Sequence, residues 1–262
     1  MTRHWWAFWY AMAFLTRLPV PYLKRTDAQV AATSLLYYPL VGALLGLGLL
    51  ALTAACVWWH AQVSLLLVAA LLLLLWVGFS GGLHLDGLAD SADAWVGGMG
   101  DKERTLLIMK DPQSGPMGVT AVVVILLLKF AALYALLEKA SAVQLSGWNI
   151  WLLLGGLLLV PALSRGSVLG LLATTPYVRR EGLASALVSG ATPWRVGLTG
   201  TLLALMAGVF LQTQALFILA LWLTVLMMAR QMMMTRIGGC TGDTLGATIE
   251  IQEALLLAAI AL

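Results

Sequence analysis

Three aspartates at helical spacing are the first residues in this chain that could do chemistry. Asp86, Asp90 and Asp93 are four and three residues apart, so a helix would place their carboxylates on one face, about 5–6 Å from one another. Carboxylates this close repel, and a divalent cation removes the repulsion. Mg²⁺ is usually held by one or two carboxylates together with substrate phosphate oxygens. The spacing therefore predicts a Mg²⁺ site.

The alternative to a metal site is a solvated acidic helix face. Half of the chain's 12 acidic residues fall between positions 86 and 111, whereas an ordinary acidic surface would spread them along the chain. This crowding favours the metal site. His84, two residues before Asp86, is either a general base or a hydrogen-bonded structural residue, and the sequence leaves both readings open.

Two other segments carry polar groups that could serve a site. Lys110 and Asp111 precede a turn rich in Pro and Gly, and a lysine there could bind phosphate. The glycine-rich run 238–247 contains Asp243. Beyond it Glu250 lies in an apolar segment, as Lys129 does elsewhere, and a charge in such a segment needs a partner. We expect these two residues to pair, for either a structural or a functional reason.

The composition identifies the environment of the chain. Hydrophobic residues make up 61% of its 262 residues and charged residues 10%, and the mean hydropathy is +0.93. A soluble domain carries about 25% charged residues, so this is an integral membrane protein. The net charge of +3 has its source in basic loops on one side of the membrane, and we expect no nucleic-acid partner.

The apolar segments predict an all-α polytopic bundle of about seven transmembrane helices. The expected spans are 35–56, 63–80, 119–137, 148–163, 197–211, 215–230 and 247–262. All of the 15 basic residues except Lys129 and Lys139 lie on alternate segments, namely 1–34, 81–118, 164–196 and 230–246. The positive-inside rule places these segments and the N-terminus in the cytoplasm.

The chain is expected to form a single membrane domain, 1–262, whose cytoplasmic segments differ in role. The predicted parts are an interfacial N-terminal segment, 1–34, an acidic catalytic loop, 81–118, a basic loop, 164–196, and a glycine-rich motif, 238–247. Trp5, Trp6 and Trp9 favour an interfacial position for the first of these segments.

Several of these runs resemble the cobalamin synthase family. The similar segments are Gly82 to Asp90, the Lys110-Asp111 pair, Arg180 to Leu183 and Gly239 to Ala247, with Thr16 to Pro19 near the start. They extend from the N-terminal region to the last span, so the resemblance covers the whole chain. The family usually has Ser after the basic-Asp pair, where this chain has Pro112, which puts the role of a hydroxyl there in doubt.

The resemblance implies a Mg²⁺-dependent enzyme in the bacterial inner membrane with its active site on the cytoplasmic face. It would join adenosylcobinamide-GDP to α-ribazole, or to α-ribazole 5′-phosphate, and release GMP. Asp86, Asp90 and Asp243 would hold Mg²⁺, with His84, Asp86 and Asp93 as catalytic groups. The substrate phosphates would be bound by Lys110, Asp111, Arg165 and Arg180.

Two other functions fit parts of the pattern. Asp-Gly-x-Ala-Asp at 86–90 is similar to the CDP-alcohol phosphotransferases, but the rest of their longer pattern is absent. An ion-coupled transporter would explain the intramembrane charges, but it should have related halves and acids near the bilayer midplane. The acids of this chain gather instead at one face.

Overall fold

The structure is a computed structural model that describes residues 2–59, 64–141, 148–179 and 185–262. All the regular secondary-structure elements in these ranges are helices, which are joined by loops. The described chain contains no strand and one isolated β-bridge, between Tyr177 and Cys240. Several helices are long and apolar enough to cross a membrane. The predicted all-α polytopic membrane fold is confirmed.

The helices of the first half are α1 (Arg3–Leu15), α2 (Ala28–Ser34), α3 (Tyr38–Trp59), α4 (Leu65–Ser80), α5 (Leu83–Gly97), α6 (Lys102–Ile108) and α7 (Pro116–Ser141). The second half contains α8 (Trp148–Leu154), α9 (Val160–Thr174), α10 (Pro193–Leu211), α11 (Ala215–Ile237) and α12 (Gly242–Ala261). A π-helical turn, Gly155–Leu159, joins α8 to α9, and short 3₁₀ turns lie at Leu35–Tyr37, Ser185–Gly190 and Gln212–Gln214.

Five segments of the described chain have the length and composition of a membrane span, or six if α4 and α5 are counted together as one broken span. The five are Ala28–Cys56, Pro116–Ser141, Trp151–Thr174, Pro193–Ile237 and Gly242–Ala261. The 45-residue segment Pro193–Ile237 contains both α10 and α11, which pack against each other after a turn at Gln212, where φ is 46°. The expected number of seven spans stays a prediction.

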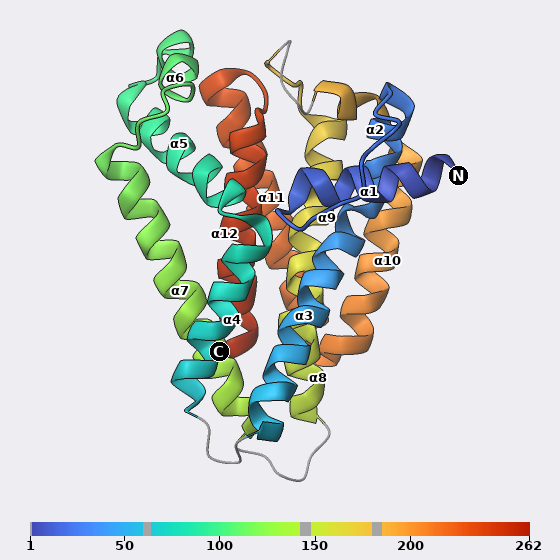
Figure 1. Ribbon diagram of the computed structural model, residues 1–262. Coiled ribbons are helices and arrows are strands. Elements are labelled where there is room, and N and C mark those ends of the chain that lie inside the picture. Colours follow the sequence, from blue (N-terminus) through green and yellow to red (C-terminus); the bar gives the residue numbers. More distant parts are fainter. Residues whose placement is uncertain (1, 60–63, 142–147, 180–184) are drawn as a thin grey trace.

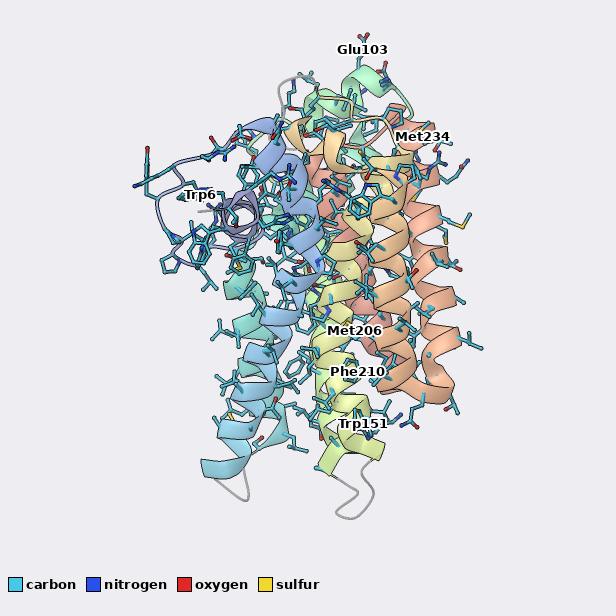
Figure 2. The ribbon with its side chains drawn as sticks, turned by 90° about the vertical axis from the view of Figure 1, so that its right-hand side faces the viewer. Trp6, Glu103, Trp151, Met206, Phe210 and Met234 are labelled. Carbon is cyan, nitrogen blue, oxygen red and sulfur yellow. The ribbon has the colours of Figure 1, made fainter. Side chains whose placement is uncertain are left out.

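Helices α1, α2, α5 and α6 gather at one end of the bundle, whereas the short helix α8 lies toward the other end. Figure 1 shows α1 lying across the long helices, with α2, α5 and α6 near the same end. Figure 2 shows Glu103 of α6 at that end and Trp151 toward the opposite one, where its ring lies 6.2 Å from that of Phe210. The segments 1–34 and 81–118, which contain these four helices, therefore share one end of the bundle.

A sharp bend directs the acidic helix away from its preceding span. The axes of α4 and α5 differ by 84°, and the two residues between them, Gly81 and Gly82, have φ of 60° and 75°. Glycine adopts this left-handed conformation without a steric penalty. A side chain at Gly81 would also meet the aliphatic part of Arg17. The bend places α5 outside the span formed by α4, at the end of the bundle that carries the basic segments.

The last helix lies at the centre of the molecule. Helix α12 contacts α5, α7, α9 and α11, and Figure 1 shows it between them. Most of its residues are buried, as they are in α9, whereas only a few residues of α7 are buried. The inward positions of α12 are thus fixed by protein neighbours on several sides, and α7 presents a broad apolar face outward.

Candidate active site

The acidic residues of α5 and α12 come together because glycines let the two helices approach closely. A Cβ atom at Gly87 would lie 2.7 Å from the carbonyl oxygen of Asp243 and 2.9 Å from its Cα. One at Gly246 would lie 3.3 Å from the Cα of His84. The backbone of one helix therefore occupies the space that a side chain of the other would need. This crossing brings Asp86, on α5, to the start of α12.

The start of α12 is fixed by local hydrogen bonds and by a residue far away in the sequence. Thr241 and Thr244 form a reciprocal capping box that satisfies free backbone groups of the first turn. The Asp243 carboxylate in that turn pairs with Arg179 at 2.6 Å. Arg179 also donates to the Met109 carbonyl at 3.2 Å. One arginine thus joins the end of α6, the segment after α9 and the start of α12.

Asp90 is the third aspartate of the expected metal set, and the negative charges of Asp86 and Asp243 act on its carboxylate. Burial, together with the charges of Asp86 and Asp243, raises the pKa of Asp90 to about 6. The nearby Arg179 guanidinium opposes this shift. We name Asp86, Asp90 and Asp243 the acidic cluster. In the described part of the chain, no three His, Cys, Asp or Glu side chains already surround a single ion position.

Asp93 serves a different purpose in the structure. Its two carboxylate oxygens accept hydrogen bonds from the backbone N–H groups of Gly115, at 2.6 Å, and Gly118, at 2.8 Å. These groups lie at the start of α7, where a carboxylate stabilises unpaired donors and the helix dipole. A side chain at either glycine would collide with the carboxylate. Asp93 therefore positions α7 against α5, and both of its oxygens are already engaged.

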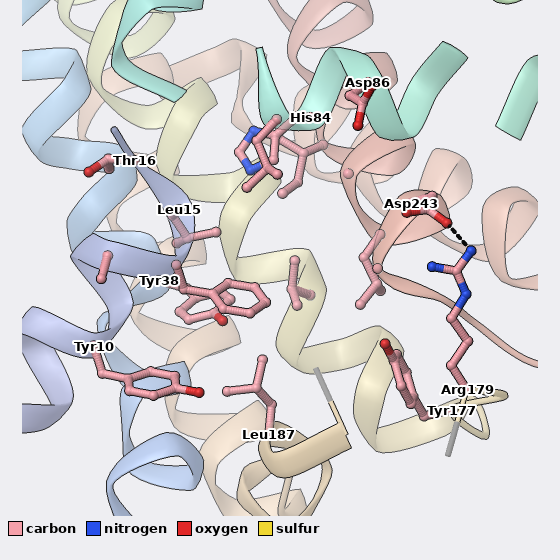
Figure 3. Close-up of a pocket in the computed structure, with 18 of the residues that line it drawn as sticks. Tyr10, Leu15, Thr16, Tyr38, His84, Asp86, Tyr177, Arg179, Leu187 and Asp243 are labelled. Atoms are coloured by element: carbon pink, nitrogen blue, oxygen red, sulfur yellow. Dashed lines mark ion pairs between the residues drawn. The ribbon is translucent and has the colours of Figure 1, made fainter. Parts of the chain in front are cut away.

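Two members of the acidic cluster, Asp86 and Asp243, line a pocket with a volume of about 940 Å³. Its charged side is formed by Asp86, Asp243, Arg179, Lys110 and Arg17. The other side carries aromatic and aliphatic groups from α1, α3 and the turn at 185–190. Figure 3 shows Asp243 with Arg179 on one side of the pocket and Tyr10 with Tyr38 on the other. Such a pocket suits a ligand with a phosphate-rich part and an apolar part.

His84 lines the same pocket but is poorly suited to remove a proton. Its side chain is 3% exposed, and neither ring nitrogen has a hydrogen-bond partner in the described structure. Burial, together with the positive charge of Arg165, lowers the pKa of His84 to about 3. A base this weak takes a proton inefficiently near neutral pH. Its burial and low pKa argue against His84 as the general base, and the hydrogen bond expected of a structural histidine is also absent from the described structure.

The residues expected to bind phosphate lie in different environments. Lys110 is exposed and lines the pocket. Asp111 is also exposed, but its carboxylate accepts from the Gln113 N–H at 3.0 Å and is not part of the pocket wall. Arg180 lies outside the described residues.

The expectation for Arg165 needs correction, because this residue lies inside the bundle rather than in the pocket. Its side chain is fully buried and pairs with Glu253 at 2.6 Å. Lys129 lies 2.6 Å from Glu250, the partner that the sequence suggests, and 2.6 Å from Glu253 as well. The Trp76 ring N–H also donates to Glu253, at 2.8 Å. Two cations and two carboxylates thus neutralise one another, and Arg165 has no direct route to a substrate phosphate.

Sequence reasoning did not single out Arg179 or Arg17, which complete the charged side of the pocket. Arg179 reaches Asp243 because the isolated bridge at Tyr177 and Cys240 aligns the two segments, with hydrogen bonds of 2.8 and 2.9 Å on either side of Cys240. No periodicity relates positions 179 and 243, so the sequence offers no signal for this pair. Phosphate binding was instead predicted for Arg180, the next residue in the chain.

Comparison with known proteins gives a consistent result. The chain matches the family described as cobalamin-5-phosphate synthase over residues 7–261. It is 46% identical to an adenosylcobinamide-GDP ribazoletransferase of Pseudomonas savastanoi pv. phaseolicola, covering 97% of this chain and 98% of the relative. Proteins of the same description from Pseudomonas fluorescens strain Pf-5 and Ectopseudomonas mendocina are 48% and 47% identical, over 97% and 96% of this chain and 98% and 97% of theirs. No solved structure matches the chain.

Proposed function

Because the chain belongs to the cobalamin-5-phosphate synthase family, we propose that it is a membrane enzyme that transfers adenosylcobinamide phosphate from adenosylcobinamide-GDP to a ribazole. The acceptor is α-ribazole or its 5′-phosphate, and GMP is released. The observation that carries the proposal is the similarity along almost the whole length of relatives that bear this description. The pocket supports it, because a charged wall and an apolar wall face each other across one cavity.

The reaction exchanges one phosphorus–oxygen bond for another. A ribazole hydroxyl attacks the phosphorus on the cobinamide side of the diphosphate, and the bond to the GMP oxygen breaks. The hydroxyl proton passes to a carboxylate of the acidic cluster, and GMP leaves with the negative charge. Lys110 and Arg179 lie on the pocket wall beside these carboxylates. Their positive charges would bind the diphosphate and oppose the charge that develops on it.

We further propose that the acidic cluster holds Mg²⁺ when the substrate is bound. Asp86 and Asp243 line the pocket, and their charges raise the pKa of the nearby Asp90, so the mutual repulsion of the three carboxylates favours a cation. Proteins usually bind Mg²⁺ with one or two carboxylates, while substrate phosphate oxygens and water occupy the remaining coordination positions. The ion would neutralise charge on the diphosphate.

We propose a location for the enzyme from its membrane helices and its basic segments. The chain is a multi-pass membrane protein, and we propose the inner membrane of a bacterium, with the pocket on the cytoplasmic side and lipid around the outer helices. The support is that the segments carrying the basic residues share the end of the bundle where α5 and α6 lie. The test introduces Glu103→Cys into a variant that lacks Cys56 and Cys240. In intact cells a membrane-impermeant maleimide should not label this cysteine, and it should do so once the membrane has been opened to expose the cytoplasmic face.

The function is tested by supplying the purified protein with adenosylcobinamide-GDP, α-ribazole and Mg²⁺. We expect GMP and the joined corrinoid in equal amounts, and loss of both when EDTA is added. Asp86→Asn should lower the rate by at least about 100-fold, because it removes a charge at the reacting diphosphate. Glu103→Gln, which changes an exposed acid on α6, should leave the rate unchanged. Unaltered turnover in Asp86→Asn or in EDTA would contradict the metal assignment.

No structural observation favours the other two functions. The pocket has both an apolar and a charged wall at one end of the molecule, whereas a transporter would be expected to bind its substrate near the bilayer midplane. The two buried charges that suggested transport, Lys129 and Glu250, form an ion pair within a cluster that also contains Glu253 and Arg165. The relatives described as adenosylcobinamide-GDP ribazoletransferases do not favour a CDP-alcohol phosphotransferase.

A further inference from the structure

The pocket has an aromatic wall that the transfer chemistry does not use. We name Tyr10, Phe14, Leu15, Tyr38 and Leu187 the aromatic wall; all five line the pocket, and Figure 3 shows Tyr10 and Tyr38 across it from Asp243. The Phe14 ring lies 6.1 Å from the Tyr38 ring and 6.5 Å from the Tyr10 ring, in both cases nearly parallel, with interplanar angles of 27° and 12°. Flat ligands stack well against such surfaces.

Two residues that line the pocket carry buried polar groups without hydrogen-bond partners in the described structure. The Tyr38 side chain is fully buried and its hydroxyl makes no hydrogen bond within the described structure. Ser34, one turn earlier, donates its hydroxyl to the Ala31 carbonyl. His84, also buried, has two unpaired ring nitrogens. A buried polar group without a partner destabilises the folded protein. A ligand that supplied the missing partners would therefore gain more than stacking alone provides.

We propose that the aromatic wall binds the base of the ribazole substrate. This inference rests on the proposed function and names where one of its two substrates lies. The ligand is a riboside whose base is a flat bicyclic ring with apolar edges and one unsubstituted ring nitrogen. The base stacks on Phe14, and the Tyr38 hydroxyl donates a hydrogen bond to its ring nitrogen. With the base held there, the ribose extends across the pocket toward the acidic cluster, where its hydroxyl reacts.

The other flat base in the reaction, the guanine of adenosylcobinamide-GDP, suits this wall poorly. Guanine carries several donors and acceptors along its edges, and each would need a partner once it was removed from water. The aromatic wall offers two phenol hydroxyls, from Tyr10 and Tyr38, and otherwise hydrocarbon. A benzimidazole-type base has a single acceptor and apolar edges. The chemistry of the wall therefore matches the ribazole base, and the charged side of the pocket matches the diphosphate.

The experiment measures the binding of α-ribazole by equilibrium dialysis and the KM of each substrate in the transfer assay. Phe14→Leu removes the ring while keeping an apolar side chain, and Tyr38→Phe removes only the hydroxyl. We expect Phe14→Leu to weaken α-ribazole binding and raise its KM about 5- to 10-fold, and Tyr38→Phe to do so about 5-fold. The KM for adenosylcobinamide-GDP should stay within about twofold of the wild-type value.

Phe8→Leu is the matched control, because Phe8 is an aromatic residue of the same helix that is not part of the pocket wall. It should leave both KM values unchanged. A rise in the KM for adenosylcobinamide-GDP alone would place guanine or the corrin on the aromatic wall and overturn the inference. Unchanged α-ribazole binding in both Phe14→Leu and Tyr38→Phe would overturn the inference. The proposed function would still stand in that case, provided that the wild-type protein carries out the transfer. Absence of both turnover and α-ribazole binding in the wild type would contradict both proposals.

Discussion

Arg179 lies 2.6 Å from Asp243 although the two residues are on separate segments, and the contact leaves each side chain partly exposed to the pocket, at 24% and 20%. The pair keeps one carboxylate of the acidic cluster in place and presents a guanidinium beside it. Because Arg179 also donates to the Met109 carbonyl, it connects three segments that border the pocket. Its position is therefore decisive both for the local charge and for the arrangement of the wall.

Replacing Arg179 should separate these two contributions. Arg179→Gln is expected to lower kcat/KM for adenosylcobinamide-GDP by at least about tenfold, because a charge-assisted contact to the diphosphate and the support of Asp243 are both lost. Arg179→Lys keeps the charge but not the forked geometry, and should recover part of the activity. Arg104→Gln, at an exposed position on α6, serves as the control. Equal activity in Arg179→Gln and Arg104→Gln would show that Arg179 does not act at the site.

The buried charges at the centre of the bundle predict a large effect on stability. Glu253 accepts from Arg165 and Ser164 with one oxygen and from Lys129 and Trp76 with the other. Glu253→Gln would leave two buried cations with the single carboxylate of Glu250, and we expect it to lower the free energy of unfolding by about 3–5 kcal/mol.

The measurement is the midpoint of thermal unfolding in detergent. Glu138→Gln, at an exposed position near the end of α7, should leave the midpoint within about 1 °C of the wild type, since surface substitutions change stability little. If Glu253→Gln unfolded at the same temperature as this control, the four buried charges would not be interdependent as their contacts indicate.

The helix crossing predicts that Gly87→Ala is damaging although it adds one methyl group. The new Cβ would lie 2.7 Å from a backbone oxygen of Asp243, and backbone cannot move aside as a flexible side chain can. We expect α5 and α12 to separate slightly, so that the apparent affinity for Mg²⁺ and the activity both fall at least about tenfold. Gly78→Ala, on α4, has open space around its added Cβ and should preserve both. Wild-type activity in Gly87→Ala would mean that the close crossing is not required.

The acidic cluster predicts how activity depends on pH. The pKa of Asp90 is raised to about 6 by burial and by the charges of Asp86 and Asp243, so its carboxylate gains a proton as the pH falls through that value. The folded state favours this protonated form, so the shift adds stability that is fully present below the ordinary pKa of the carboxyl and is lost as pH rises through about 6. Cation binding, by contrast, needs the ionised carboxylate of Asp90, so it is favoured as the pH rises through about 6.

At subsaturating Mg²⁺ we therefore expect the rate to decline as pH falls through about 6, and added Mg²⁺ to move this decline to lower pH. In Asp90→Asn the remaining activity should no longer show the decline. His84→Gln should keep it at the same pH, because the pKa of His84, about 3, lies well below this range. A decline that vanished in His84→Gln and persisted in Asp90→Asn would reverse the assignment of the titrating group.

Much of the molecule follows from local properties of the chain. Long apolar runs determine spanning helices, because backbone groups in lipid must satisfy one another within a helix. The 3.6-residue period places Asp86 and Asp90 on one face of α5, and the isolated charges Lys129 and Glu250 had to find partners inside the bundle. The resemblance to the cobalamin synthase family likewise rests on short runs of residues that can be read directly. These properties depend only on neighbours within a few turns.

The tertiary structure decided which distant groups meet. It brought Arg179 to Asp243, buried Arg165 against Glu253, engaged Asp93 with the start of α7 and placed the aromatic residues of α1 on the pocket wall. Each of these outcomes depends on how closely two helices approach and at what angle they cross, as Gly87 and the bend at Gly81 show. Packing between segments far apart in the chain sets those distances, and no periodicity in the sequence encodes them.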